Sequence, residues 1–137
     1  MTSTVVYEGD LRTTCTHLRS DSHFETDAPV DNNGKGERFS PTDLMATSLA
    51  TCMVTVMGIK ARTMGLDLNG VKVDVEKIMK AEPRRVGGIN LFFHFPEALQ
   101  DVDQKTKQVL KHTGNTCPVQ HSIHPDIEVS VDWGEWR

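Results

Sequence analysis

A long apolar segment in the first half of the chain constrains the fold more than any other feature of the sequence. From Leu44 to about Met64 the residues are apolar or small nearly all round a helical projection, beginning LMATSLATCMVTVMGIKA. A helix with apolar residues on most faces lies at the centre of a fold, and burial in a subunit interface explains the pattern equally well. The remaining residues, or a second copy of the chain, must therefore cover this segment.

The start of this helix is also marked in the sequence. Ser40 is a good capping residue, Pro41 suits the first helical position, and Asp43 lies where it can complete a capping box with Ser40. Gly65 is a natural C-terminal cap. The sequence therefore predicts a helix from Pro41 to about Met64.

The segments on either side of the helix predict strands. Residues 3–27 contain three β-rich stretches separated by turns, and 126–133 alternates as a final strand. Between the first helix and the final strand, the sequence predicts a hairpin of 71–79 with 89–95. A second helix follows, from Pro96 and Glu97 to about His112. Residues 113–115 break this helix, and Pro118 could start a short helical turn. This order predicts an α+β fold with an antiparallel sheet. At 137 residues we expect a single domain, 1–137.

The composition excludes several functional classes. The chain has 15 Lys and Arg against 19 Asp and Glu, a net charge of −4, which does not favour a nucleic-acid binder. We expect no membrane span, because no apolar run approaches the roughly 18 to 20 residues that one requires. The N-terminus lacks the features of a secretory signal, which predicts a cytoplasmic location. Three cysteines in that reducing compartment are expected to be free thiols.

Each cysteine has a structural and a reactive interpretation. Cys52 lies in the apolar helix, where it is either a small buried hydrophobe or a nucleophile activated by a nearby cation. Cys117 stands between the helix break and Pro118, so it is either a packed loop residue or a thiol at the edge of a short helix, where backbone N–H groups favour the thiolate. Cys15 is expected to fill space in a strand.

Histidines near Cys117 offer two further alternatives. Cys117, His121 and His124 provide three zinc-ligand residue types, although their spacing matches no well-defined signature. Cys117 and His121 are also a possible nucleophile–base pair for acyl transfer, without any nucleophile elbow to support it. We therefore expect no metal and no bound cofactor.

Two stretches together resemble the OsmC-like family, which includes organic hydroperoxide resistance proteins. FSPTDLMATSLATCMVTVMGIKARTMGLDLNG is similar to the central-helix segment of that family, and TCPVQHSIHPDIEVSVDW to its second-cysteine motif. The intervening PRRVGGINLFFHFPEAL fits the family's hairpin. The resemblance covers about residues 34–133.

The resemblance implies the OsmC-like fold: an intertwined α+β homodimer with antiparallel sheets around long central helices and two sites at the interface. It also implies a thiol-dependent peroxidase activity on organic hydroperoxides. Cys52 would be the peroxidatic residue and would form a sulfenic acid. Cys117 would resolve it to a disulfide, which an external dithiol then reduces. The implied role is in the oxidative-stress response.

The chain departs from the family peroxidases just before the reactive cysteine. Those proteins have a Glu after the helix-opening proline, where it holds an arginine against the cysteine; here the position is Thr42. Asp43 follows, but it lies nine residues before Cys52, about half a turn out of phase. A non-catalytic small-molecule-binding or redox-sensing protein on the same scaffold is therefore the alternative. The candidates for the arginine are Arg12, Arg19 and Arg38.

Overall fold

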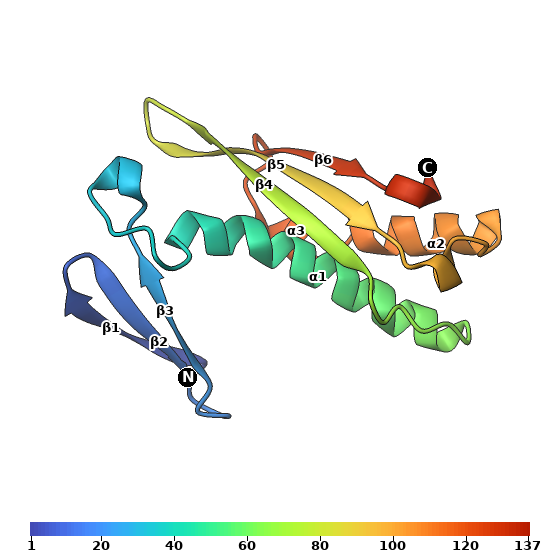
Figure 1. The fold of residues 1–137 in the computed structure, drawn as a ribbon, viewed down its shortest axis with the longest axis horizontal. Helices are drawn as coiled ribbons and strands as arrows, with labels where there is room; N and C mark the ends of the chain where they lie inside the picture. Colours follow the sequence, from blue (N-terminus) through green and yellow to red (C-terminus); the bar gives the residue numbers. More distant parts are fainter. The chain divides into compact units, whose positions relative to one another are not determined.

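The computed structural model describes all 137 residues, which form two compact units, Met1–Met45 and Ala46–Arg137 (Figure 1). The class is α+β, as predicted. The strands are β1 (Ser3–Gly9), β2 (Arg12–His17), β3 (His23–Asp27), β4 (Lys72–Lys80), β5 (Arg85–His94) and β6 (Glu128–Asp132). The α-helices are α1 (Pro41–Thr63), α2 (Gln104–Asn115) and α3 (Pro118–Ser122), and the 3-10 turns are η1 (Val30–Asn32), η2 (Glu97–Leu99) and η3 (Gly134–Trp136).

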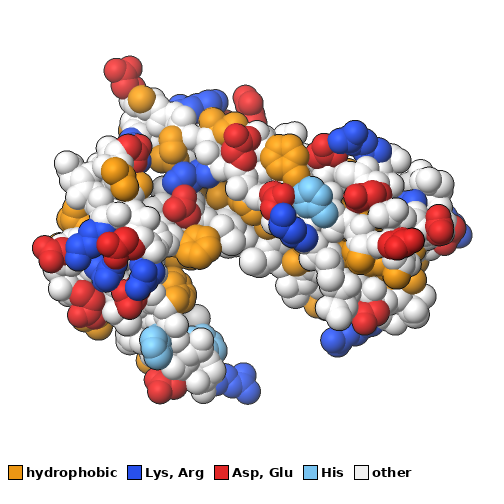
Figure 2. Space-filling view, in the orientation of Figure 1, with side chains coloured by type: hydrophobic (Ala, Val, Ile, Leu, Met, Phe, Trp, Pro, Cys, Tyr) orange, Lys and Arg blue, Asp and Glu red, His pale blue; other side chains and the backbone are white.

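The first unit is an antiparallel sheet in the order β1-β2-β3, as the sequence predicts. Its registers place Val5, Cys15 and Phe24 side by side on one face of the sheet. Val5 and Phe24 remain 64% and 50% exposed, and Figure 2 shows hydrophobic side chains reaching the surface of this unit between charged ones. The side chains that are buried in this unit are all polar: Thr26, Asp27 and Ser40.

The second unit contains the sheet β4-β5-β6, in which β4 and β5 form the predicted hairpin. Strand β6 runs parallel to β5, so the expectation of purely antiparallel sheets is wrong for this pair. The physical reason is the connection: α2 and α3 lie between the two strands and carry the chain back, so that β6 starts at the same end as β5.

The core of the second unit lies against one face of α1. Its apolar members include Leu49, Met53 and Met57 from α1, Leu91 from β5 and Leu110 from α2, all with no exposed surface. The opposite face of α1 is uncovered in the single chain, where Ile59 is 61% exposed. The prediction of a buried central helix is therefore confirmed for one face only.

Helix α1 is also long and apolar enough to cross a membrane by length and composition alone. The premise that no apolar run is long enough is wrong for Pro41–Thr63, because Thr and Ser residues interrupt the apolar run without adding charge. The core helix of a water-soluble protein has the same properties, and the buried face of α1 fits that interpretation.

The second helix begins later than predicted. Pro96 and Glu97 open only the 3-10 turn η2, and α2 starts after Asp103, whose side chain accepts a hydrogen bond from the Thr106 N–H at 3.0 Å. The predicted break at 113–115 is also wrong, because these residues are helical. Gly114 is used for close packing: a Cβ there would lie 2.9 Å from Sδ of Met57.

Candidate functional site

The structure brings Cys52 and Cys117 together in the second unit. Cys52 is half-buried in the middle of α1, and Cys117 is 1% exposed at the N-terminus of α3. Both are free thiols, and their side chains are close enough for Cys52 to raise the pKa of Cys117. Two cysteines that are far apart in the sequence therefore lie within reach of one another.

Close packing of two helices makes this meeting possible. Gly114, near the end of α2, lies against Met57 and Met53 of α1, at 2.9 and 3.5 Å from the position of its missing Cβ. Met53 is the neighbour of Cys52, and Cys117 follows Gly114 after a single turn of chain. A larger residue than glycine at 114 would hold the two helices apart and with them the two sulfurs.

The surroundings of Cys117 keep its proton in place. Burial raises the pKa of this thiol, and the nearby Cys52 side chain raises it further. The backbone N–H of Gln120 donates to Sγ at 3.4 Å and acts in the opposite direction, as does that of Val119. The predicted position at a helix N-terminus is confirmed, but burial outweighs the stabilisation of the thiolate that we expected there.

A shallow groove of about 360 Å³ adjoins the same turn. It is lined by residues from the end of α2, from α3 and from β6: Asn115, Gln120, Val129, Val131 and Trp133. Gln120 is the residue whose N–H contacts the Cys117 sulfur. The groove therefore brings solvent close to the turn that holds Cys117.

The alternatives built on histidine receive no support from the geometry. No three His, Cys, Asp or Glu side chains form a group that could hold a metal ion, so Cys117, His121 and His124 are not a zinc site in this structure. The contact between Cys117 and His121 is a backbone hydrogen bond, N–H to carbonyl at 3.2 Å, while the His121 side chain is exposed. Cys15 lies in the first unit, where Thr13 Oγ1 is 3.9 Å from its sulfur.

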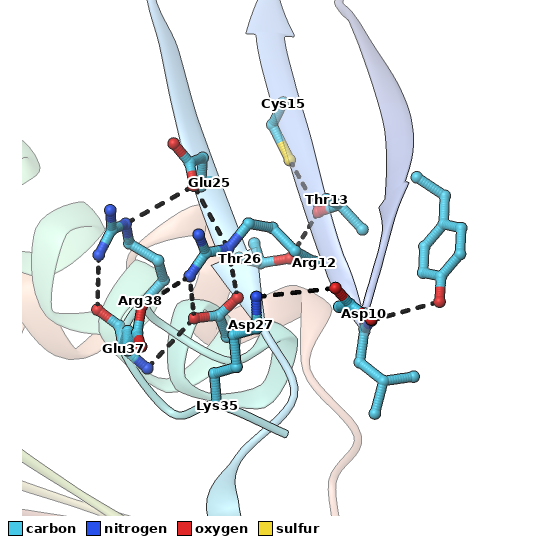
Figure 3. Close-up of polar contacts among 12 residues, drawn as sticks. Asp10, Arg12, Thr13, Cys15, Glu25, Thr26, Asp27, Lys35, Glu37 and Arg38 are labelled. Carbon is cyan, nitrogen blue, oxygen red and sulfur yellow. Dashed lines mark hydrogen bonds and ion pairs between the residues drawn. The ribbon is translucent and has the colours of Figure 1, made fainter. Parts of the chain in front are cut away.

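The first unit contains an ionic cluster that sequence reasoning missed (Figure 3). Arg12 donates from Nε and Nη2 to the two carboxylate oxygens of Asp27, at 2.7 and 2.8 Å, and from Nη2 to Glu37 at 3.1 Å. Asp27 is 1% exposed, and the hydrogen bonds from Arg12 hold the pKa of its carboxyl below the ordinary value. Arg12 and Asp27 are partners across β2 and β3, in a register that the single turn between these two strands sets.

The three candidate arginines therefore differ in how firmly they are held. Arg12 is fixed by bidentate hydrogen bonds to Asp27, whereas Arg38 makes a longer ion pair with Glu25, at 3.8 Å. Arg19 lies in the exposed turn between β2 and β3. Arg12 is the only one of the three with a guanidinium fixed in both position and orientation.

The start of α1 is as predicted. Ser40 Oγ accepts from the Asp43 N–H at 3.0 Å, and the Asp43 carboxylate accepts from the Ser40 N–H at 2.9 Å. Thr42 Oγ1 lies 3.2 Å from Ser40 Oγ. The acid and hydroxyl at the beginning of this helix are thus engaged in its capping.

Comparison with known proteins adds three findings. The model of the OsmC-like protein family matches residues 34–132. The chain is 52% identical to a candidate osmotic stress induced and detoxification response protein from Psychrobacter arcticus 273-4, over 97% of this chain and 95% of that one, with a TM-score of 0.92. No curated protein sequence matches the chain significantly.

More distant structures share the fold. An organic hydroperoxide resistance protein OsmC from Legionella pneumophila is 18% identical, over 97% of this chain and 96% of that one, with a TM-score of 0.72. The organic hydroperoxide resistance protein OhrB of Bacillus subtilis is 15% identical, over 97% and 98%, with a TM-score of 0.65. At these identities the likeness concerns the fold.

Proposed function

Because the chain belongs to the OsmC-like protein family, we propose that it is a thiol-dependent peroxidase that reduces organic hydroperoxides with Cys52 and Cys117. The observation that carries this proposal is the pair of free, interacting thiols, one half-buried and one buried. Structural relatives named as organic hydroperoxide resistance proteins support the same activity.

In the first step, the Cys52 thiolate attacks the terminal oxygen of the hydroperoxide. A sulfur–oxygen bond forms, the O–O bond breaks, and its electron pair leaves with the alkoxide, which takes up a proton to give the alcohol. The peroxide is reduced by two electrons, and Cys52 is oxidised to a sulfenic acid.

In the second step, the Cys117 sulfur attacks the Cys52 sulfenic acid. A disulfide forms, and the hydroxyl group leaves with the Cys117 proton as water. An external dithiol then donates two electrons and two protons to restore both thiols, and is itself oxidised to a disulfide. No bound cofactor or metal takes part in this scheme.

The geometry supports Cys52 as the residue that reacts with the peroxide and Cys117 as the residue that resolves the sulfenic acid. The thiolate is the nucleophilic form of cysteine, and the raised pKa of Cys117 keeps that residue a thiol. Cys52 is also the more accessible of the two. Cys52 therefore meets the substrate first, and Cys117 holds its proton until the sulfenic acid has formed.

We further infer that the working form is a homodimer. The first unit buries no apolar side chain, and a unit of this size does not fold stably without additional burial. On the uncovered face of α1, the hydroxyl groups of Thr51 and Thr55 donate to carbonyls of their own helix. These hydroxyls therefore require no further partner when another surface covers them. A second copy that covers both surfaces explains the apolar pattern that the sequence shows on every side of α1. A cytoplasmic location is part of the same proposal.

Thiol counting tests the proposal directly. Reduced protein is treated with one equivalent of cumene hydroperoxide and its intact mass is measured under non-reducing conditions. We expect the loss of two hydrogens, with the peptides containing Cys52 and Cys117 joined in a peptide map. Three unreacted thiols after minutes of exposure would overturn the peroxidase and favour the alternative, a binding or redox-sensing protein.

Matched cysteine variants assign the roles. Cys52→Ser should lose all turnover, and Cys117→Ser should retain one reaction with peroxide and accumulate a sulfenic acid that dimedone traps. Cys15→Ser is the control, since Cys15 lies in the first unit on β2, and it should keep full turnover. A disulfide that still forms in Cys117→Ser, using Cys15, would contradict the assignment of Cys117.

A further inference from the structure

Two loops of the chain contain an asparagine followed by a glycine, at Asn33-Gly34 and at Asn69-Gly70. In such a pair the glycine nitrogen can attack the side chain of the asparagine, because glycine has no side chain to obstruct the approach. Both asparagines are exposed to solvent. The sequence alone makes the two sites equivalent, but their backbone contacts differ in the structure.

The backbone at the first site is held by hydrogen bonds and close packing. The Gly34 N–H donates to the Pro29 carbonyl at 2.9 Å, and the Asn32 N–H donates to the same carbonyl at 2.9 Å. Gly34 also lies so close to Ala28 that a Cβ on the glycine would overlap the Ala28 carbonyl. The Gly34 nitrogen must therefore break a hydrogen bond before it can turn toward the side chain of Asn33.

The reacting groups at the second site are free. Asn69 and Gly70 lie in the connection from α1 to β4 (Figure 1). The Val71 N–H donates to the Leu68 carbonyl at 3.1 Å and closes a turn around them. Within the chain, the Gly70 N–H has no hydrogen-bond partner, and neither has the side-chain amide of Asn69. The nearest side chain to the missing Cβ of Gly70 is Pro96, at 3.7 Å. Neither hydrogen bonds nor close packing hold the two reacting groups apart.

We propose that Asn69 is a site of spontaneous deamidation and that the fold protects Asn33 from the same reaction. The Gly70 nitrogen gives up its proton and attacks Cγ of Asn69, so that a carbon–nitrogen bond forms and closes a succinimide ring. The bond from Cγ to the side-chain nitrogen breaks, and this nitrogen leaves with the proton as ammonia. Water then opens the ring at either carbonyl, which gives aspartate or isoaspartate. This inference does not rest on the proposed peroxidase function.

The product changes the connection between α1 and β4. Asp67 already lies there, and its carboxylate accepts a hydrogen bond from the Asn69 N–H at 2.9 Å. Deamidation adds a second carboxylate two residues away, and isoaspartate also adds a methylene group to the main chain. This connection and α1 form a groove of about 590 Å³, in which Arg62 is the one cation and Asp67 the one carboxylate among the lining residues. The charge of the lining therefore changes from neutral to negative.

Peptide mapping of aged protein tests the proposal. The folded protein is incubated at mildly alkaline pH, and the peptides that contain Asn33 and Asn69 are quantified by mass spectrometry with chromatographic separation of the isoaspartyl form. We expect the Asn69 peptide to gain the mass difference between an amide and an acid. The Asn33 peptide should react about tenfold more slowly, because its glycine must first give up a backbone hydrogen bond. Equal rates at the two sites, or no reaction at Asn69, would overturn the proposal.

An unfolded control separates the effect of the fold from that of the sequence. In concentrated guanidinium chloride the hydrogen bond from Gly34 to Pro29 is lost, so the two asparagines should react at similar rates. A difference of the same size in the unfolded chain would assign the selectivity to neighbours in sequence and would contradict protection by the fold.

Matched variants locate the change of charge. Asn69→Gln should keep the elution position of fresh wild-type protein on ion exchange, because the longer side chain closes a ring much more slowly. Asn33→Gln should age at the rate of the wild type. An Asn69→Gln variant that gains negative charge as fast as the wild type would place the reaction elsewhere and overturn the assignment to Asn69.

Discussion

The two units of the chain are held together by different forces. In Ala46–Arg137, apolar side chains of α1, β5 and α2 form a core without exposed surface. In Met1–Met45, the buried side chains are polar, and the best-defined contact is the ion pair between Arg12 and Asp27. Hydrophobic burial stabilises a unit in proportion to area, whereas a buried ion pair gives little net stability but fixes geometry. The second unit is thus built for stability, and the first for holding charged groups in defined positions.

The largest expected effect is the loss of a core aromatic side chain from the second unit. Trp136 has no exposed surface, stacks on Phe95 with ring centroids 3.8 Å apart, and donates from Nε1 to the Leu99 carbonyl at 2.8 Å. Trp136→Ala should lower the free energy of unfolding by about 3–5 kcal/mol, measured by urea denaturation.

Phe24→Ala is the counterpart in the first unit. Phe24 is 50% exposed in the single chain, which predicts a change within about 0.5 kcal/mol if nothing covers it. A larger loss that grows as the protein is diluted would show that a second copy covers this face. A large loss independent of concentration would contradict the difference between the two units.

An effect smaller than that of Trp136→Ala is expected where the first unit leads into α1. Ser40→Ala removes the side-chain acceptor for the Asp43 N–H and should cost about 1 kcal/mol of stability. Ser40→Thr keeps that acceptor and should restore most of the loss. Urea denaturation of both variants is the measurement, and equal stability of the alanine and threonine variants would contradict the capping role.

Two glycines test how closely the helices of the second unit pack. Gly58 in α1 has nothing within 4 Å of its missing Cβ, so Gly58→Ala should raise stability by about 0.5–1 kcal/mol through helix propensity. Gly114→Ala brings a methyl group to 2.9 Å from Sδ of Met57, and overpacking of about 1–3 kcal/mol should offset that gain.

Thermal unfolding of both variants measures these changes. A gain in both would mean that α2 does not press against α1 in solution. A gain in Gly58→Ala in dilute protein that becomes a loss at high concentration would place a second copy on the uncovered face of α1.

The smallest effect near neutral pH is expected from the ion pair of the first unit. Arg12 lowers the pKa of Asp27, so the pair contributes stability above the unfolded carboxyl pKa of about 3.9, and this contribution is lost as the pH falls through the lower folded value. The protection of the β2 and β3 amides from exchange, taken relative to the intrinsic rate at each pH, should therefore fall only in acid. Asp27→Asn should remove this acid dependence in the first unit.

Asp103→Asn is the matched control in the second unit. The pKa of Asp103 is also lowered, by its hydrogen bonds with Thr106. This substitution should leave the acid dependence of β2 and β3 unchanged. An unchanged acid response in Asp27→Asn would show that other carboxyls cause it.

Features fixed by neighbours in sequence could be predicted, and features fixed by distant contacts could not. The capping box of Ser40 and Asp43 and the short helix at Pro118 depend on four consecutive residues, and both are confirmed. The direction of β6 depends on the path of α2 and α3, which connect it to β5. Gly114 was predicted to break its helix because its packing partner, Met57, lies far away in the sequence.

The candidate site shows the same limit. Spacing alone left Cys52 and Cys117 each with a structural interpretation, and their pairing was expected only from the resemblance to the OsmC-like family. The contact between Arg12 and Asp27 follows from the register of β2 and β3, which places residues 15 positions apart in the sequence side by side. The burial that raises the pKa of Cys117 comes from the packing of several segments and has no local sequence signal.

The cap of α3 gives the site a spectroscopic reporter. The Gln120 N–H points at the Cys117 sulfur, so its resonance senses whether that sulfur carries a hydrogen or a bond to another sulfur. A disulfide sulfur is a poorer and differently placed acceptor, and the Gln120 amide signal should shift as the pair is oxidised. Nuclear magnetic resonance can then follow turnover on the unlabelled cysteines in real time, from one backbone amide that takes no part in the chemistry.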